Sequence, residues 1–414
     1  MLMSIFDKSF IHAISADEAA VFDMHFMSNI TPLFFIEVLA DLEKTNLEEG
    51  REALVKSLAG KTPVWASYPN MPHGQIVEME LRGYPIELRQ VPIVGGGRRV
   101  QTAEGLGTVY DESPEMKAKS RWDRGEFGAD EYQVARAWRD ALRAAPAETA
   151  VLLDGSPYRF TFDDLASIKR HVDRLLDRSG SRYSTLNGAL ELFGVGRSQR
   201  GEIIQRWKRA GGPPLNDFLP YAMHVIAVDL FRILAMASGH ISSEKTSNYA
   251  DLAYLYYLPF CEVFISMDKL HRKCAPLFMS ERQAFVWGND LRPHLAMLVE
   301  EYLAHPDIEE RGLQGIAKSR RFPRGSFIGD LIRKLRANYQ DDERRDYSSR
   351  LNAEQEKALV ERLSAAKDAP PPAEDYDPQE EDQTMTFTRR VPVRRGRFAF
   401  MPKAATDKAE KPER

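Results

Sequence analysis

The chain has few of the residues that stabilise secreted proteins or zinc-binding modules. Only two of its 414 residues are cysteines, Cys261 and Cys274, and each lies in or beside an apolar run. A disulfide framework normally shows a denser set, and a zinc site needs paired ligands at short spacing. The nine histidines show no metal-ligand spacing, and no Ser/His/Asp or Cys/His motif is recognisable. We therefore expect reduced thiols in a cytoplasmic protein. The sequence does not support nucleophilic catalysis by a Ser or Cys residue.

Long apolar runs are missing as well. No stretch approaches the ~20 continuous apolar residues that span a bilayer. The first seven residues lack the basic start and long apolar run of a signal peptide. We therefore expect no membrane segment and no internal repeat. The hydrophobic fraction of 43% allows a sizeable core, whereas the net charge of −4 indicates no particular partner because charge is spread unevenly along the chain.

Local patterns suggest that the chain begins as an α/β domain. Residues 1–62 open with a short apolar strand that stops at Asp7, which we expect to be buried. A capping box at Ser15–Glu18 predicts a helix, and Pro32 is placed at the start of a second one, where its missing N–H costs nothing. We interpret this segment as the first part of a central-sheet domain.

Residues 63–240 have a different character. Alternation of apolar and polar residues over 75–91 predicts a β-hairpin. Thr161–Asp164 predicts another capping box, and residues 216–237 predict one long, largely buried helix. We interpret this part as an inserted β-hairpin and helical region.

The α/β pattern returns in residues 241–300. Asp251 is predicted to open an apolar helix that ends at Pro259. Residues 263–265 predict a short buried strand, and Ser266-Met-Asp268 follows at its carboxyl end. This part is interpreted as the second half of the central-sheet domain.

The remaining chain is predicted to be helical and basic over 301–365, and disordered over 366–414. The tail is rich in Pro, Glu, Lys and Arg, and such a composition buries too little apolar surface to offset the entropy of ordering. Basic residues mixed with aromatics suit phosphate contact and base stacking. The residues that we expect to contact nucleic acid are Lys269, Arg320, Arg321 and Arg324.

Four acids occupy positions where burial is expected. Asp7 and Asp268 each follow a short apolar strand, at the edge where ligands gather in open α/β sheets. Glu37 lies in an apolar helix face, and Asp251 at the start of an apolar helix. Carboxylates close together in a low-dielectric site repel one another, and Mg²⁺ or Mn²⁺, which prefer oxygen ligands, relieve that repulsion. Such an ion would also activate water and stabilise a phosphodiester transition state.

In the order and sequence context of these four acids, the chain resembles the PIN-like nuclease family. The family's first strand ends in an Asp followed closely by a hydroxyl residue, as in Asp7-Lys-Ser9, and its next acid is a helical Glu, here Glu37. The family closes with an Asp that opens a helix and a strand that ends in Thr/Ser-x-Asp. Asp251 and the sequence Ser266-Met-Asp268 match that part, and the two acids are 17 residues apart (268 − 251).

The resemblance covers about residues 1–45 and 245–275. It implies a three-layer α/β core with a central, mostly parallel sheet, interrupted by the large hairpin-plus-helical insertion, because about 200 residues separate the second and third acids. It implies a metal-dependent endonuclease that acts on RNA. The catalytic and metal-binding residues would be Asp7, Glu37, Asp251 and Asp268, with the hydroxyls of Ser9 and Ser266 supporting the ligands.

Structural roles also explain some of these residues. Asp7 and Asp268 suit backbone N–H groups at strand-to-helix turns, and Asp251 suits the first turn of a helix. Glu37 is harder to explain in this way, because its neighbours are apolar. Asp41, one helical turn later, is either a fifth member of the site or a solvated edge residue.

Other patterns leave more than one interpretation. Gly95–Arg99 favours a flexible loop over a phosphate site, since it lacks the Lys-Ser/Thr of a Walker loop. Residues 185–209 show a helix–glycine turn–helix pattern that is typical of DNA docking or of ordinary packing. His224 and Asp229 are interpreted as buried, hydrogen-bonded residues. Two other functions stay open. The chain is either a non-catalytic nucleic-acid-binding or scaffold protein, or a component of a complex whose protein partner binds the helical insertion.

Overall fold

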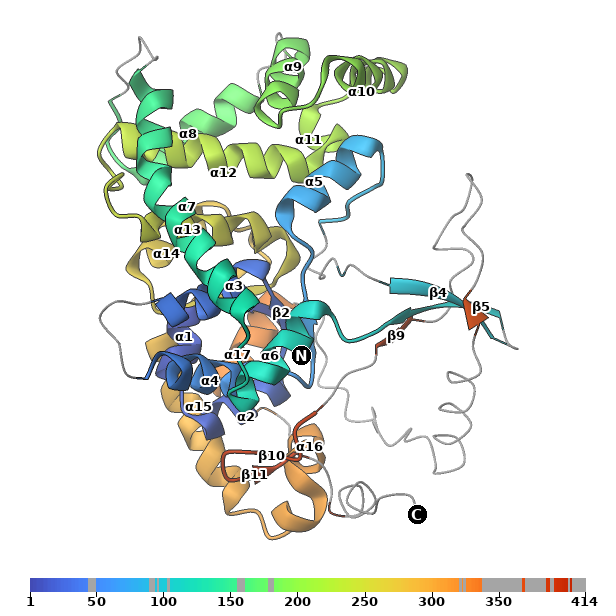
Figure 1. Cartoon of the computed structure of the whole chain (residues 1–414), viewed down its shortest axis with the longest axis vertical. Coiled ribbons are helices and arrows are strands. Elements are labelled where there is room, and N and C mark those ends of the chain that lie inside the picture. The colour runs from blue at the N-terminus through green and yellow to red at the C-terminus, as the bar shows by residue number, and fades with distance from the viewer. Residues whose placement is uncertain are drawn as a thin grey trace.

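The computed structural model describes residues 1–43, 50–88, 94, 97–102, 105–154, 161–177, 182–319, 322, 325–336, 367–368, 385–387, 391–400 and 403. Within these residues the protein is a mixed α/β fold, mostly helical, built around a five-stranded parallel sheet (Figure 1).

The central sheet joins strands from the two ends of the α/β sequence pattern. Its strand order is β3-β2-β1-β6-β7, and every neighbouring pair is parallel. Phe6 of β1 lies opposite Ile265 of β6, which confirms the prediction that the strands ending near Asp7 and Ile265 belong to one sheet. The five strands are β1 (Leu2–Phe6), β2 (Phe26–Ile30), β3 (Ser67–Pro69), β6 (Val263–Ser266) and β7 (Ala284–Trp287). Strand β3, which follows residue 62, is also part of this sheet.

Helices cover both faces of the sheet, which explains why all five residues of β1 are buried. Leu2 and Phe6 point into one apolar core, which also contains Phe22 of α2 and Leu295 of α15. Ile5 points into a second core on the opposite face, formed largely by α12 and η3. The helices of the described residues are α1 (Lys8–Ala13), α2 (Ala16–His25), α3 (Pro32–Leu39), η1 (Ala40–Glu43), α4 (Arg51–Lys61), α5 (His73–Arg82), α6 (Pro114–Arg124), α7 (Ala129–Asp154), α8 (Leu165–Leu176), α9 (Arg182–Leu192), α10 (Arg197–Arg209), α11 (Leu215–Phe218), α12 (Pro220–Ala237), α13 (Ser247–Ala253), η3 (Tyr254–Phe260), α14 (Lys269–Cys274), η4 (Ala275–Leu277), α15 (Gly288–Leu303), α16 (Ile308–Ser319) and α17 (Phe327–Leu335).

The predicted hairpin over residues 75–91 is wrong, because this segment contains helix α5. Ile76, Val77 and Leu81 are buried on one side of that helix. Gly83 ends it in the left-handed conformation, with φ of 103°. An antiparallel hairpin does occur later, between β4 (Gly97–Thr102) and β5 (Gly105–Tyr110), and it extends away from the central sheet (Figure 1).

Several helix starts differ from the sequence prediction by a few residues. The second capping box is formed by Asp164 and Ser167, so Thr161 lies outside it. The long helix predicted over 216–237 is divided at Leu219 into α11 and α12. Asp251 lies within α13, which begins at Ser247, and therefore does not open a helix.

The tail predicted to be disordered contains a packed segment at 391–400. Strands β10 (Arg394–Arg395) and β11 (Phe398–Ala399) pair with each other, and Phe398 and Phe400 are buried in the first core. Arg395 is buried beside Asp23, with its Nη1 3.3 Å from Asp23 Oδ2. The other short strands described in this region are β8 (Lys367–Asp368) and β9 (Met385–Phe387), which pair with the β4–β5 hairpin.

One helix of the described residues, α12, is long and apolar enough to cross a membrane by length and composition. Its 18-residue window has a mean hydropathy of 1.4, and 56% of that window is buried inside the molecule. Within the molecule α12 packs against α5, α8 and η3. A core helix passes the same test of length and composition.

Candidate functional site: a buried acidic centre

Asp7 and Asp268 lie at the carboxyl edge of the central sheet. Asp7 follows β1 and is the N-cap of α1, and Asp268 follows β6 and is the N-cap of α14. The strand order reverses between β1 and β6, since β2 and β3 extend to one side and β7 to the other. In open α/β sheets this is the point at which ligands bind.

Asp7 is the most extensively bonded of the four acids. Its carboxylate accepts hydrogen bonds from Ser9 Oγ at 2.7 and 2.8 Å, from Ser266 Oγ at 2.8 Å and from the Phe10 N–H at 3.1 Å. The two hydroxyls are fixed in turn, because Ser9 Oγ accepts the N–H of Met267 and Ser266 Oγ accepts the N–H of Asp268. Both serines that the family resemblance assigned to supporting positions therefore donate to Asp7.

His271, one turn into α14, lies beside this carboxylate. Its Nδ1 is 3.4 Å from Asp7 Oδ2 and 2.8 Å from Ser266 Oγ, and its Nε2 is 2.7 Å from the carbonyl oxygen of Asp251. Burial lowers the pKa of His271, but the hydrogen bond and charge of Asp7, together with the charge and carbonyl of Asp251, outweigh burial and raise it to about 9. Burial likewise raises the pKa of Asp7, but His271 and the serine hydroxyls hold that pKa below its ordinary value. The centre therefore contains an imidazolium paired with a carboxylate.

Glu37 reaches the centre from α3. Tyr254 O–H donates to Glu37 Oε2 at 2.6 Å. Burial raises the pKa of Glu37, and the charge of Lys8 and the Tyr254 hydrogen bond only partly offset it. Lys8 Nζ donates to the Glu37 carbonyl at 3.2 Å and to Asp41 Oδ1 at 3.0 Å. Asp41, left open as a fifth member or a solvated residue, is thus buried and paired with Lys8.

Asp251 is electrostatically coupled to the other acids. Burial raises the pKa of Asp251 to about 7, the charge of His271 lowers it, and the charges of Asp268 and Glu37 raise it further. Asp268 Oδ1 accepts the Leu270 N–H at 2.6 Å, which is an ordinary N-cap contact. The four predicted acids therefore belong to one electrostatic neighbourhood, although each also has structural contacts.

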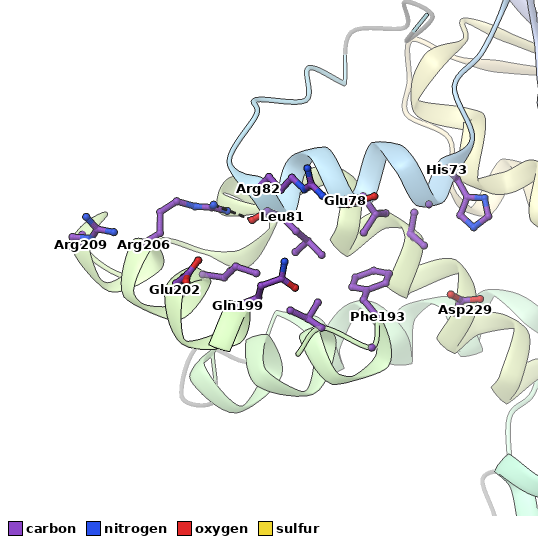
Figure 2. Close-up of a pocket in the computed structure, with 16 residues that line it drawn as sticks. His73, Glu78, Leu81, Arg82, Phe193, Gln199, Glu202, Arg206, Arg209 and Asp229 are labelled. Carbon is purple, nitrogen blue, oxygen red and sulfur yellow. Dashed lines mark hydrogen bonds and ion pairs between the residues drawn. The ribbon is translucent and has the colours of Figure 1, made fainter. Parts of the chain in front are cut away.

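The acids do not form a ready-made metal cage. In the described residues no group of three or more His, Cys, Asp or Glu side chains is arranged to hold a metal ion. The cavity seen in Figure 2 is lined by none of the four acids and lies between α5, α10 and α12.

The predicted nucleic-acid contacts are only partly described. Lys269 is exposed at the start of α14, next to Asp268. Arg320, Arg321 and Arg324 lie outside the described residues. In the same basic region, Arg336 is committed to Glu262, with two contacts of 2.7 Å.

Three residues of the acidic centre were not predicted from the sequence: His271, Lys8 and Tyr254. His271 carried a weak local signal, since it is three residues after Asp268 in the helix that follows a strand ending in Ser-x-Asp. Lys8 directly follows Asp7, but its contacts with the segment around Glu37 depend on how two helices pack. Tyr254 was interpreted as part of an apolar helix, and only the folded chain reveals its hydroxyl contact.

Comparison of the chain with protein-family models, with curated proteins and with solved structures found no match.

Proposed function

We propose that this protein is a PIN-like phosphodiester hydrolase that cuts RNA in the cytoplasm, with its acidic centre as the active site. The observation that carries the proposal is that Asp7 and Asp268 follow the adjacent parallel strands β1 and β6, at the point where the strand order reverses. Glu37 and Asp251 are coupled to them through the charges that raise the pKa of Asp251. Exposed Lys269 adds a cation beside Asp268 for the substrate backbone.

The residue types of the acidic centre suit Mg²⁺ or Mn²⁺, but their arrangement fits such an ion less well. Buried carboxylates that raise one another's pKa are oxygen ligands whose repulsion a divalent cation relieves. When bound, such an ion supplies an activated water and stabilises charge on the phosphodiester. However, Asp7 is already saturated by hydroxyl, amide and imidazolium donors, and the described residues present no three-ligand group. We therefore assign the four acids as candidate ligands and derive no reaction step from the ion.

A second candidate function is a non-catalytic nucleic-acid-binding or scaffold protein. The observation that favours it is charge compensation, since His271 pairs with Asp7 and Lys8 pairs with Asp41. A centre neutralised by its own cations is stable without a metal ion. In this case the helices of the region 63–240 would bind a protein or nucleic-acid partner.

A cleavage assay distinguishes the two candidates. The parent is incubated with end-labelled single-stranded RNA and DNA oligonucleotides, with Mg²⁺, with Mn²⁺ or with a chelator. A hydrolase cuts RNA only when metal is present, and Asp268→Asn abolishes the cut while Asp290→Asn, an exposed control on α15, does not. Binding without cleavage under every metal condition would favour the non-catalytic candidate.

A further inference from the structure

A groove in the helical region is separate from the acidic centre. One side is α5 and the other is α10, while α12 forms the floor and the turn before α10 closes one end (Figure 2). Its volume is about 680 Å³, which is within the range of ligand sites. The α10 side, from Gln199 to Arg209, is about 15 Å long at the rise of an α-helix.

Several charged side chains along this groove are paired with neighbours, and the cations left unpaired among the described residues lie at one end. Arg82 is paired with Glu78, and Asp229 is held by Arg232 and Tyr256. Arg206 is fixed by backbone carbonyls, with Nη1 3.0 Å from the Leu81 oxygen and Nη2 3.2 Å from the Glu80 oxygen, so its charge is not neutralised by them.

Arg209 lies one turn beyond Arg206 and has no ion pair within the part of the chain that the structure describes. The remaining carboxylate of the groove is Glu202. Neither guanidinium group is ion-paired with a described carboxylate, although the charge of buried Glu80 acts on Arg206. Two such groups near one exposed carboxylate favour an anionic ligand at this end.

The opposite end of the groove is aromatic. The ring of His73 stacks on Tyr256, with centroids 4.5 Å apart and planes 20° from parallel. Phe193, from the turn before α10, lies across from α5 at this end (Figure 2). Flat rings of this kind offer faces on which a nucleobase stacks.

The aromatic end is connected to the acidic centre through η3. Tyr254 of η3 donates to Glu37, Tyr256 stacks with His73, and the Tyr257 hydroxyl accepts the His73 N–H at 3.0 Å. η3 is itself buried, so it fixes the aromatic end relative to the acidic centre without offering a surface for a ligand.

We propose that this groove holds a segment of the single-stranded nucleic acid on which the acidic centre acts. Bases stack at His73 and Phe193, and Arg206 and Arg209 contact the phosphates. A polymer fits better than a free nucleotide, because Gln199, Glu202 and Arg209 are exposed and a small-ligand site would enclose most of its ligand. This inference rests on the proposed function, and it assigns the helix–glycine turn–helix segment to substrate binding.

The test measures binding apart from cleavage. A fluorescent single-stranded RNA is titrated with the full-length protein in chelator, and its anisotropy is recorded at several salt concentrations. Arg209→Ala should weaken binding about fivefold and lower the salt slope by about 0.7, the contribution of one phosphate contact on a single strand. Glu202→Gln should tighten binding, because it removes a repulsive charge. Arg197→Ala is the matched control, since Arg197 is exposed on α10 and does not line the groove.

Each outcome has one meaning. Unchanged affinity in Arg209→Ala and Glu202→Gln, or an equal loss in Arg197→Ala, would overturn the groove assignment. Displacement of the RNA by a free mononucleotide at a similar concentration would also overturn it, in favour of a small-ligand site. If the RNA binds through the groove but the parent never cuts it with Mg²⁺ or Mn²⁺, the groove assignment stands and the hydrolase proposal fails.

Discussion

Asp7 and His271 show how a buried carboxylate remains charged in this molecule. Asp7 is 4% exposed and His271 is fully buried, so each charge has lost nearly all of its solvent. Their contact, together with two serine hydroxyls, compensates for that loss. Removing either partner leaves the other without its opposite charge.

His271→Gln should therefore lower the free energy of unfolding by about 3–5 kcal/mol, the usual cost of breaking one side of a buried pair. Adding Asp7→Asn to this variant should recover part of the loss, because the remaining buried charge is removed. Denaturant unfolding of the parent, both single variants and the double variant measures this coupling. Additive losses in the double variant would show that the two residues do not act as a pair.

The residues of the candidate site were predictable where the signal is local. Asp7 and Asp268 were found because each ends a short apolar strand, and Glu37 because a charged residue is unusual within an apolar helix face. His271 and Tyr254 were missed, because their roles depend on contacts with residues distant in the sequence, as Tyr254 with Glu37.

Among the elements, α5 and α12 are joined by a buried carboxylate. Glu80 of α5 accepts the N–H groups of Tyr221 and Ala222, at 2.9 and 2.7 Å, and so caps the first turn of α12. Burial raises the pKa of Glu80 to about 7 even though these N–H groups lower it. The folded protein therefore holds a proton on Glu80 more tightly than the unfolded chain does.

This difference predicts a pH dependence of stability. A carboxyl whose pKa is raised on folding destabilises the fold as pH rises from its unfolded value of 4.5 to about 7. The stability of the parent relative to Glu80→Gln should fall over that window, by up to about 3 kcal/mol, and be flat above it. Denaturant unfolding at pH 4.5, 5.5, 6.5 and 7.5 measures it. A relative stability that stays constant or increases would contradict the assignment.

Elements were predictable where one local pattern dominates. The strand β1 and helix α2 follow from an apolar run and a complete capping box, Ser15 with Glu18. Helix α5 was mistaken for a hairpin, because its apolar residues also fit the alternation of a strand. The packed segment at 391–400 lies in a polar, charged stretch, and its burial depends on Asp23 and Thr62, far away in the sequence.

The C-terminal hairpin should contribute to stability. Phe400 is fully buried in the first core, and the Arg395 guanidinium lies 5.3 Å from its ring centroid. Phe400→Ala should lower the free energy of unfolding by about 3–5 kcal/mol, as is usual for a buried Phe. Val393→Ala is the control in the same hairpin, since Val393 is 48% exposed. Equal melting temperatures for the two variants would show that the hairpin is not packed in solution.

At the scale of the whole molecule, the central sheet is completed only by distant parts of the chain. β1 is flanked by β2 from residues 26–30 and by β6 from residues 263–266. Without β6 and β7, β1 becomes an exposed edge, and Ile5 loses the second core. The α/β elements at the two ends of the pattern are therefore expected to fold as one unit.

A fragment of residues 1–62 should accordingly be unfolded by itself. It lacks β3, β6 and β7, and thus three of the five strands. Circular dichroism with thermal melting measures this, with the full-length chain as the reference. A fragment that melts cooperatively would show that residues 1–62 form an independent unit.

The central proposal is that the four acids are ligands of a divalent cation. The most direct measurement is the shift in melting temperature that saturating Mg²⁺ or Mn²⁺ causes in the parent, in Asp7→Asn, Glu37→Gln, Asp251→Asn and Asp268→Asn, and in the exposed control Asp290→Asn. An ion that binds only the folded state stabilises it by about 2.7 kcal/mol at 100 times its Kd. If the four acids bind the ion, we expect this gain in stability in the parent and in Asp290→Asn, and a much smaller gain in each of the four acid variants. No metal-induced shift in the parent, or the same shift in all six proteins, would contradict it.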